Sequence, residues 1–157
     1  FIPEKHWVQD EKIGGGRIIG EACHFVDTIQ YLDGSKLIDL NIQFLNNDAF
    51  SKKDNCIINL KFESGAIGNV LYTSMGSKKY PKERLKVFSD GIVYELDNYI
   101  KLIRYGNRKK TSFKLKQDKG LEKEYRYISN VILGKQENNS VDDAFVGMKM
   151  LLKSWSN

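Results

Sequence analysis

Apolar residues recur at helical spacing in three segments of this chain, and the first of these extends from Gly16 to Leu32. At about 100° per residue, one face of the segment is wholly apolar and the opposite face carries glycine and polar residues. The apolar face holds Ile18, Ile19, Ala22, Val26 and Ile29, and the opposite face holds Gly20, His24, Asp27 and Tyr31. The pattern predicts an amphipathic helix that ends at Asp33-Gly34 and directs a histidine and an aspartate away from its own core.

Two more helices are predicted at the end of the chain. Leu121, Tyr125, Ile128 and Ile132 repeat at helical spacing before Gly134. A second apolar stripe extends from Val141 to Trp155 and follows a segment that resembles a capping box. We assign this stripe to core packing.

Between these helices, apolar and polar residues alternate with the period of two that is typical of half-buried strands. This alternation is found in 38–44 and 58–62, and further strands are predicted at 66–73, 85–88, 92–96, 102–105 and 113–115. Ser64-Gly65, Asp90-Gly91 and Gly106-Asn107 separate neighbouring segments, and such dipeptides favour hairpins. About seven strands joined by hairpins predict a predominantly antiparallel sheet. The expected fold class is α+β, in a single domain over residues 1–157, with helices packed on one face of the sheet and the other face open.

The composition excludes several classes of protein. Hydrophobic residues make up 41% of the 157 residues, as in a globular domain, and no apolar run reaches the roughly 18 residues of a membrane helix. Two cysteines and two histidines lack the paired spacing of a zinc site, so we expect no metal, free thiols and a cytoplasmic location. The net charge is +5, and residues 101–126 hold ten Lys/Arg against three Asp/Glu. Because no nucleic-acid motif accompanies them, we expect a solvated hairpin there rather than a nucleic-acid interface.

Polar residues of the first predicted helix are the best candidates for chemistry. His24 could act as a general acid–base, because an unperturbed histidine titrates near neutral pH, or it could lie on a solvated surface. Arg17 could bind a carboxylate or phosphate through its guanidinium, or it could be an ordinary surface arginine. Glu21 could contribute to the site or simply favour the helix dipole in the first turn. Asp27 could orient His24 or face water.

Secondary candidates lie on either side of this helix. Gly14-Gly15-Gly16 would let the backbone approach a ligand closely. Trp7 could stack on a sugar or pack at the domain edge. Lys82 and Arg84, near Pro81, are weaker candidates.

Trp7, the glycine triplet and His24 together resemble the start of the C-terminal domain of the glucose–fructose oxidoreductase/inositol dehydrogenase (Gfo/Idh/MocA) family. In that family the helix also carries an aspartate four residues before the histidine, which would fall at Gly20 and is absent here. Three further segments continue the resemblance: Gly68–Tyr72, Pro81–Phe88 and Gln117–Gly120. They are similar to a branch in which this domain is fused behind a zinc-type alcohol dehydrogenase module.

The resemblance implies an NAD(P)-dependent dehydrogenase for a sugar, polyol or nucleotide sugar, in which His24 contacts or deprotonates the substrate hydroxyl. Trp7, Arg17, Glu21 and Asp27 are then predicted to bind substrate. The sequence contains neither the G-x-G-x-x-G turn of a dinucleotide-binding domain nor the Glu-Lys-Pro element that these enzymes place beside the nicotinamide. We therefore expect the chain to be the substrate-side part of a larger protein, with no cofactor bound to it and no activity alone.

The resemblance also implies that the open sheet face packs against another subunit, so we expect a homo-oligomer. Tyr72, Ile92, Tyr94 and Phe113 are predicted to supply apolar contacts at that interface. The missing aspartate at Gly20 leaves an alternative open. The chain could instead be a non-catalytic binding or assembly module whose functional surface is the sheet face.

Overall fold

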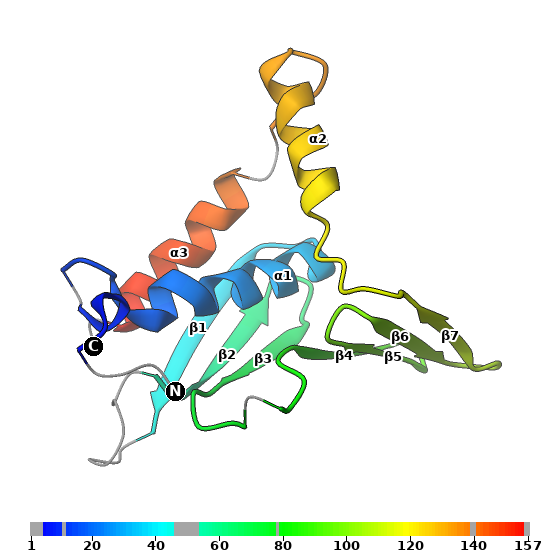
Figure 1. Cartoon of the computed structure of the whole chain (residues 1–157), viewed down its shortest axis with the longest axis horizontal. Helices are drawn as coiled ribbons and strands as arrows, with labels where there is room; N and C mark the ends of the chain where they lie inside the picture. Colours follow the sequence, from blue (N-terminus) through cyan, green and yellow to red (C-terminus); the bar gives the residue numbers. More distant parts are fainter. Residues whose placement is uncertain (1–4, 11, 46–53, 78, 139–140, 156–157) are drawn as a thin grey trace. The chain divides into compact units, whose positions relative to one another are not determined.

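The computed structural model describes residues 5–10, 12–45, 54–77, 79–138 and 141–155. The chain forms two compact units, of which the first combines residues 1–76 with 139–157 and the second comprises residues 77–138 (Figure 1). The predicted α+β class is confirmed, and the described residues contain seven strands, of which the last covers Lys110–Phe113 instead of the predicted 113–115. They do not form the one sheet that was expected, but a three-stranded sheet and a four-stranded sheet, with one sheet in each unit.

The first unit is built on the three-stranded sheet, whose strand order is β1-β2-β3. The strands β1 (Leu37–Phe44), β2 (Cys56–Phe62) and β3 (Ile67–Tyr72) are antiparallel to their neighbours. Strand β2 alternates strictly between buried and exposed residues, as its sequence pattern predicts. Its buried side chains, which form the centre of the core, are Cys56, Ile58, Leu60 and Phe62.

Two helices share this core with the inner face of the sheet: α1 (Cys23–Asp33) and α3 (Val141–Trp155). Glycines allow the helices to approach closely. A side chain at Gly68 in β3 would begin 2.8 Å from a methyl group of Ile29 in α1. A side chain at Gly147 in α3 would begin 2.5 Å from the Oε1 atom of Gln30 in α1. Both contacts leave no space for a Cβ atom unless a neighbour moves.

The first helix begins differently from the prediction. Residues Ile18–Ala22 form a π-helical turn, in which the N–H of Cys23 donates to the Ile18 carbonyl five residues earlier. Helix α1 follows and ends at Gly34, whose φ of 75° is the left-handed conformation expected of a glycine cap. The two predicted faces of the segment are confirmed, because its apolar residues are buried or half-buried and its glycine and polar residues are exposed.

The outer face of the three-stranded sheet carries a row of three asparagines. Asn41, Asn59 and Asn69 occupy paired positions on β1, β2 and β3, and directly paired residues lie on the same face. All three are exposed, and the Asn69 Nδ2 atom donates to Asn59 Oδ1 at 2.9 Å. We call these three residues the amide row. The pairs that flank it are Ile57–Leu71 on one side and Lys61–Ile67 on the other.

The second unit contains a sheet of sequential antiparallel strands: β4 (Arg84–Ser89), β5 (Ile92–Asp97), β6 (Lys101–Tyr105) and β7 (Lys110–Phe113). Asp90 and Gly91 join β4 to β5 with φ values of 49° and 73°, and both are left-handed as the type I′ hairpin requires. The connection between β6 and β7 is exposed, in agreement with the predicted solvated hairpin. Helix α2 (Leu121–Ile132) follows the sheet in the sequence.

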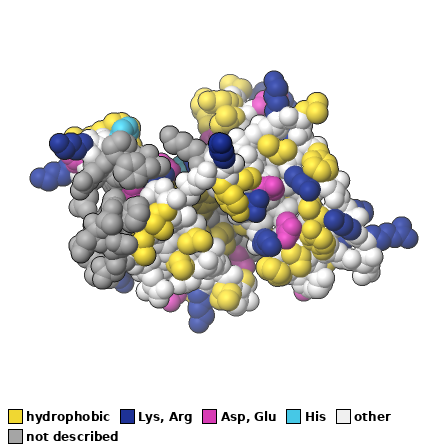
Figure 2. All heavy atoms as spheres, turned by 60° about the horizontal axis from the view of Figure 1, so that its bottom comes forward, with side chains coloured by type: hydrophobic (Ala, Val, Ile, Leu, Met, Phe, Trp, Pro, Cys, Tyr) yellow, Lys and Arg dark blue, Asp and Glu magenta, His cyan; other side chains and the backbone are white. Residues whose placement is uncertain are grey.

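The two faces of the four-stranded sheet differ in chemistry. Leu85, Leu96 and Leu102 form a paired row across β4, β5 and β6 on one face. The other face carries an ion pair between Arg84 and Asp97 at 3.5 Å and one between Lys86 and Glu95 at 2.9 Å. Apolar side chains are also exposed along α2, at Leu121, Tyr125, Ile128 and Ile132. Figure 2 shows apolar and charged side chains interspersed on the surface of the molecule.

Three observations concern the expected absences. Within the described ranges, no helix is both long and apolar enough to cross a membrane. The same residues contain no group of three or more His, Cys, Asp or Glu that could hold a metal ion. Cys23 and Cys56 are free thiols, and burial raises the pKa of Cys56 to about 11.

Candidate functional site

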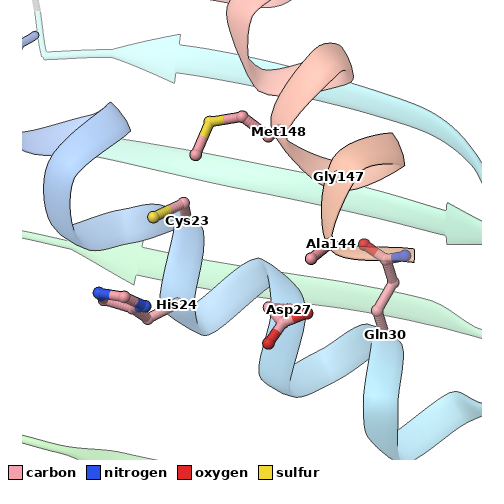
Figure 3. A pocket seen from close by; sticks show the side chains of 7 residues that line it. All are labelled: Cys23, His24, Asp27, Gln30, Ala144, Gly147 and Met148. Atoms are coloured by element: carbon pink, nitrogen blue, oxygen red, sulfur yellow. The ribbon is translucent and has the colours of Figure 1, made fainter. Parts of the chain in front are cut away.

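A pocket of about 210 Å³ lies between helices α1 and α3 (Figure 3). Two of the predicted site residues, His24 and Asp27, line it from α1, and both are exposed. Because they are three residues apart on one helix, their side chains are neighbours on its surface. The other lining residues are Cys23, Gln30, Ala144, Gly147 and Met148.

The lining of the pocket contains two side chains suited to proton transfer, His24 and Asp27. Burial raises the pKa of the Cys23 thiol, so this group stays protonated at neutral pH and is not a nucleophile. Ala144, Gly147 and Met148 present no titratable group. The imidazole of His24 can therefore take or give a proton, and Asp27 can accept hydrogen bonds from a hydroxyl-bearing ligand.

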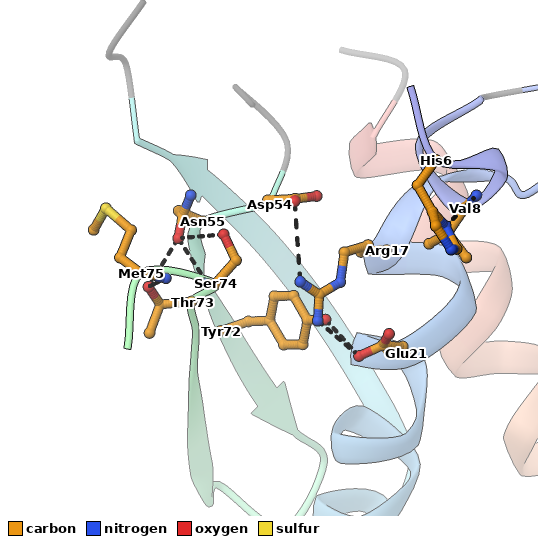
Figure 4. Close-up of polar contacts among 10 residues, drawn as sticks. All are labelled: His6, Val8, Arg17, Glu21, Asp54, Asn55, Tyr72, Thr73, Ser74 and Met75. Carbon is orange, nitrogen blue, oxygen red and sulfur yellow. Dashed lines mark hydrogen bonds and ion pairs between the residues drawn. The ribbon is translucent and has the colours of Figure 1, made fainter. Parts of the chain in front are cut away.

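Arg17 and Glu21 belong to a second group of side chains, located at the π-helical turn (Figure 4). The Arg17 Nη2 atom donates to Glu21 Oε2 at 3.0 Å, and the Tyr72 hydroxyl donates to the same oxygen at 2.8 Å. The Arg17 guanidinium lies 5.3 Å from the centre of the Tyr72 ring, and its Nη1 atom lies 4.0 Å from Asp54 Oδ2. We call Arg17, Glu21, Asp54 and Tyr72 the polar cluster.

The polar cluster is largely shielded from water. The side chains of Arg17 and Asp54 are 11% and 4% exposed, whereas that of Glu21 is 34% exposed. Burial, and after it the hydrogen bond to Glu21, raises the pKa of the Tyr72 hydroxyl, so Tyr72 remains a hydrogen-bond donor. The guanidinium of Arg17 is engaged by three neighbours within the protein. Its binding of a substrate anion stays a prediction.

The prediction that Tyr72 lies on the open sheet face is wrong. Tyr72 is 7% exposed and its hydroxyl binds Glu21 of the π-helical turn. It shares the inner face of β3 with Val70, two residues earlier, which is 8% exposed. The period of two through Val70 and Tyr72 was the signal that could have placed it in the core.

Sequence reasoning also missed the residues just before β2. Asp54 and Asn55 are both 3% exposed, although they end a polar segment without periodicity. The Asn55 Oδ1 atom accepts hydrogen bonds from the Thr73 hydroxyl at 2.8 Å and from the Ser74 N–H at 2.9 Å. Asn55 thereby joins the beginning of β2 to the end of β3. No local pattern in the sequence reveals this contact, because Thr73 and Ser74 lie 18 and 19 residues after Asn55.

The glycine triplet is required by the backbone itself. A Cβ atom at Gly14 would lie 2.6 Å from the carbonyl oxygen of Trp7 and within 3 Å of backbone atoms of Val8. Gly15 and Gly16 have φ values of 68° and 75°, which other residues adopt with strain. These glycines fold the loop that enters the π-helical turn. A role in ligand approach stays a prediction.

The family's aspartate position has room for a side chain. A Cβ atom at Gly20 would lie 3.8 Å from the Gly14 carbonyl oxygen, which is ordinary van der Waals contact. Packing therefore does not impose the glycine at this position.

The remaining candidates, Trp7, Arg84 and Lys82, do not line the pocket. Trp7 is 61% exposed and lies in a 3₁₀ turn (Trp7–Gln9) with its ring 5.8 Å from that of His6. Arg84 lies in the second unit, where it pairs with Asp97 and sits 4.7 Å from the centre of the Tyr80 ring. Lys82 is exposed in the same unit.

Residues 2–87 match the family model of the C-terminal alpha/beta domain of the Gfo/Idh/MocA oxidoreductase family. No curated protein is significantly similar to the chain in sequence. Aldose-aldose oxidoreductase from Caulobacter crescentus, solved with glycerol, is similar at a TM-score of 0.79 and 18% identity, over 99% of this chain and 49% of that one.

Two further solved structures resemble the chain. UDP-N-acetylglucosamine 3-dehydrogenase from Acidithiobacillus ferrooxidans gives a TM-score of 0.67 at 19% identity, over 88% of this chain and 45% of that one. Levoglucosan dehydrogenase, in complex with NADH and levoglucosan, gives a TM-score of 0.73 at 16% identity, over 96% of this chain and 51% of that one. At these identities the similarity establishes the fold. The chain spans about half the length of each of these proteins.

Proposed function

Because this chain belongs to the Gfo/Idh/MocA family of oxidoreductases through its C-terminal domain, we propose that it is the substrate-binding part of an NAD(P)-dependent dehydrogenase. The proposed substrate is a sugar, polyol or nucleotide sugar. Proteins of similar fold carry the names of an aldose oxidoreductase, a UDP-sugar dehydrogenase and a levoglucosan dehydrogenase, which supports this substrate class. We also propose that the parent protein belongs to the branch with a zinc-type alcohol dehydrogenase module.

One observation carries the proposal: His24 and Asp27 are both exposed on α1 and line the same pocket, where they can exchange protons and hydrogen bonds with a ligand. In the proposed role His24 takes the proton of the substrate hydroxyl at the carbon that is oxidised, or binds that hydroxyl. Asp27 in the pocket and the partly exposed Glu21 accept hydrogen bonds from neighbouring hydroxyls. Trp7 and Arg17 are proposed as further substrate contacts.

The residues of this chain do not fit the dinucleotide itself. Every strand pair in the described parts is antiparallel, so these parts contain no β-α-β unit with a phosphate-binding turn. We propose that NAD(P) is held by another part of the full-length protein. The two free thiols support a cytoplasmic location.

The second candidate function is assembly through an open sheet face. The amide row is self-complementary, because each carboxamide both donates and accepts hydrogen bonds, and it is flanked by Ile57 and Leu71, of which Leu71 is 70% exposed. We propose that a second copy of the chain packs on the outer face of the three-stranded sheet, over the amide row. Three residues first predicted for an open-face interface lie instead on the four-stranded sheet, where Phe113 is exposed and Ile92 and Tyr94 are half-buried.

Substitution of His24 in the full-length protein tests the catalytic proposal. Oxidation of free aldoses, polyols and UDP-sugars by NAD⁺ and NADP⁺ identifies an active pair, and His24→Ala is then compared with His6→Ala. His6 is the matched control because it is the other histidine of the chain and is exposed in the N-terminal loop.

We expect His24→Ala to lower kcat by about 10²–10⁴-fold if it is the acid–base group, and to raise KM alone if it only binds substrate. The free energy of unfolding should change by less than about 0.5 kcal/mol, because the residue is exposed. Wild-type kcat and KM in His24→Ala, or its unfolding, would show that His24 is a structural residue.

A further inference from the structure

The polar cluster connects the π-helical turn to the end of β3, 51 residues away in the sequence. Tyr72 Oη and Arg17 Nη2 both donate to the same Glu21 oxygen, at 2.8 and 3.0 Å (Figure 4). A carboxylate oxygen that receives two donors, one of them charged, loses most of its rotational freedom. Glu21 is therefore fixed relative to the sheet even though it is the most exposed of the three side chains.

The donors are themselves held in place. Arg17 lies over the Tyr72 ring at 5.3 Å and within 4.0 Å of Asp54, so its position is set from two sides. Tyr72 belongs to the core of the first unit, where its ring lies 6.3 Å from that of Phe25. Removal of the Tyr72 hydroxyl alone would take away one of the two donors to this Glu21 oxygen without removing an apolar group from the core.

Glu21 also occupies a special place in the backbone. It lies within the π-helical turn, and the N–H of Cys23 closes that turn on the Ile18 carbonyl. Such turns are rare and occur mostly as single turns inside helices, often at functional sites. His24 comes directly after Cys23, so the geometry of the turn sets the direction in which α1 presents the imidazole.

We propose that Tyr72 and Arg17 are positioning residues, which fix the π-helical turn through Glu21 and thereby hold His24 toward the pocket. The functional part of this inference rests on the proposed role of His24. The competing explanation is that the polar cluster only stabilises the fold. The two explanations differ in whether the environment of the His24 ring changes when a hydrogen bond of the polar cluster is removed and the core stays intact.

The test compares Tyr72→Phe with Tyr31→Phe in the full chain by NMR at one fixed pH. Tyr31 is a matched control, because it lies on the same helix α1 and is 85% exposed. In Tyr72→Phe we expect the Cys23 amide proton to exchange about tenfold faster or more, because a hydrogen bond to a charged group is lost. We also expect the ring signals of His24 to move, while those of His6 and the core amides of β2 stay unchanged. Unmoved His24 signals in a folded Tyr72→Phe would overturn the inference.

Substitutions of Glu21 keep the inference testable if Tyr72→Phe does not fold. Glu21→Gln retains an acceptor oxygen for Tyr72, whereas Glu21→Ala retains none. We expect Glu21→Gln to keep the His24 signals near those of the wild type and Glu21→Ala to move them. Equal His24 spectra in the two variants would contradict the positioning role.

The full-length enzyme separates this inference from the proposed function. Tyr72→Phe should lower kcat with little change in KM, as does a base held in the wrong direction. If His24→Ala leaves kcat and KM unchanged, the proposed function fails, whereas the NMR comparison still decides whether the cluster positions His24. If His24→Ala is inactive and Tyr72→Phe has wild-type kcat, the positioning role alone fails.

Discussion

Replacement of Gly14 by alanine separates a structural glycine from a ligand-binding one. The Cβ atom would lie 2.6 Å from the Trp7 carbonyl oxygen, with two backbone atoms of Val8 at 2.7 and 2.9 Å. All three are backbone atoms, so no side chain can swing aside to relieve the contact. The φ of Gly14 is not left-handed, so the effect of the substitution is steric rather than conformational.

The expected magnitude follows from overpacking, which costs about 1–3 kcal/mol at well-packed sites. For a chain of this length, each kcal/mol shifts Tm by about 2–4 °C, so Gly14→Ala should lower Tm by about 2–12 °C. Gly20→Ala is the matched control, since its Cβ would meet nothing closer than 3.8 Å. Alanine is favoured over glycine in a helix by about 0.5–1 kcal/mol, so Gly20→Ala should raise Tm by about 1–4 °C.

Thermal unfolding is followed by near-ultraviolet circular dichroism together with tryptophan fluorescence, to which Trp7 in this loop and Trp155 at the end of α3 both contribute. Hydrogen exchange at the Gly14 and Gly15 amides, which donate to the Asp10 carbonyl at 2.7 and 3.1 Å, reports on the same loop independently. A Gly14→Ala chain with wild-type Tm and wild-type exchange would refute the steric argument. If the same variant weakened substrate binding in the full-length protein, the role of Gly14 would be to let the backbone approach the ligand closely.

Three further predictions concern pH, assembly and the cofactor. Hydrogen bonds from Ser35 and Ser64 lower the pKa of Asp33, so its stabilising contribution is present above about pH 4 and is lost as the pH falls below that value. Asp33→Asn should therefore reduce stability in urea unfolding at pH 7 and reduce it less at pH 3, and an equal loss at both values would contradict this. Asn59→Lys should convert a dimer to a monomer in sedimentation at tens of micromolar, whereas Asp90→Lys, at an exposed hairpin, should not. A wild-type chain that is monomeric there would remove the support for assembly. NADH and NADPH should not bind the chain in calorimetric titration, and a dissociation constant in the low micromolar range would show the expectation to be wrong.

Periodicity was sufficient to predict which side of the first helix faces the core, because Ile18, Ala22 and Val26 repeat every four residues. The same spacing could not reveal the π-helical turn. Residues four apart stay near one face whether the intervening hydrogen bond spans four residues or five. The face that presents His24 could therefore be predicted, whereas the turn that sets its direction could not.

The polar cluster depends on contacts between distant segments, which one-dimensional patterns do not contain. Arg17 and Glu21 are a local pair, and their i, i+4 spacing is visible in the sequence. Asp54 and Tyr72 join them only because β2 begins and β3 terminates at the same end of the sheet, where Cys56 pairs with Tyr72. In the pocket, Gly147 and Met148 lie on a helix that the sequence assigns to core packing alone. Their position beside His24 depends on how α3 crosses α1.

The amide row also limits how much continuous apolar surface the three-stranded sheet exposes to water. On the outer face of the three-stranded sheet, three carboxamides separate Ile57 and Leu71 from Ile67. Without them the exposed side chains would merge into one continuous apolar strip across the strands, and such strips are sites of aggregation. Hydrated asparagines interrupt the strip while leaving the backbone pairing intact. The same three residues therefore oppose edge-to-edge and face-to-face sticking of exposed apolar side chains while keeping hydrogen-bonding groups on this face.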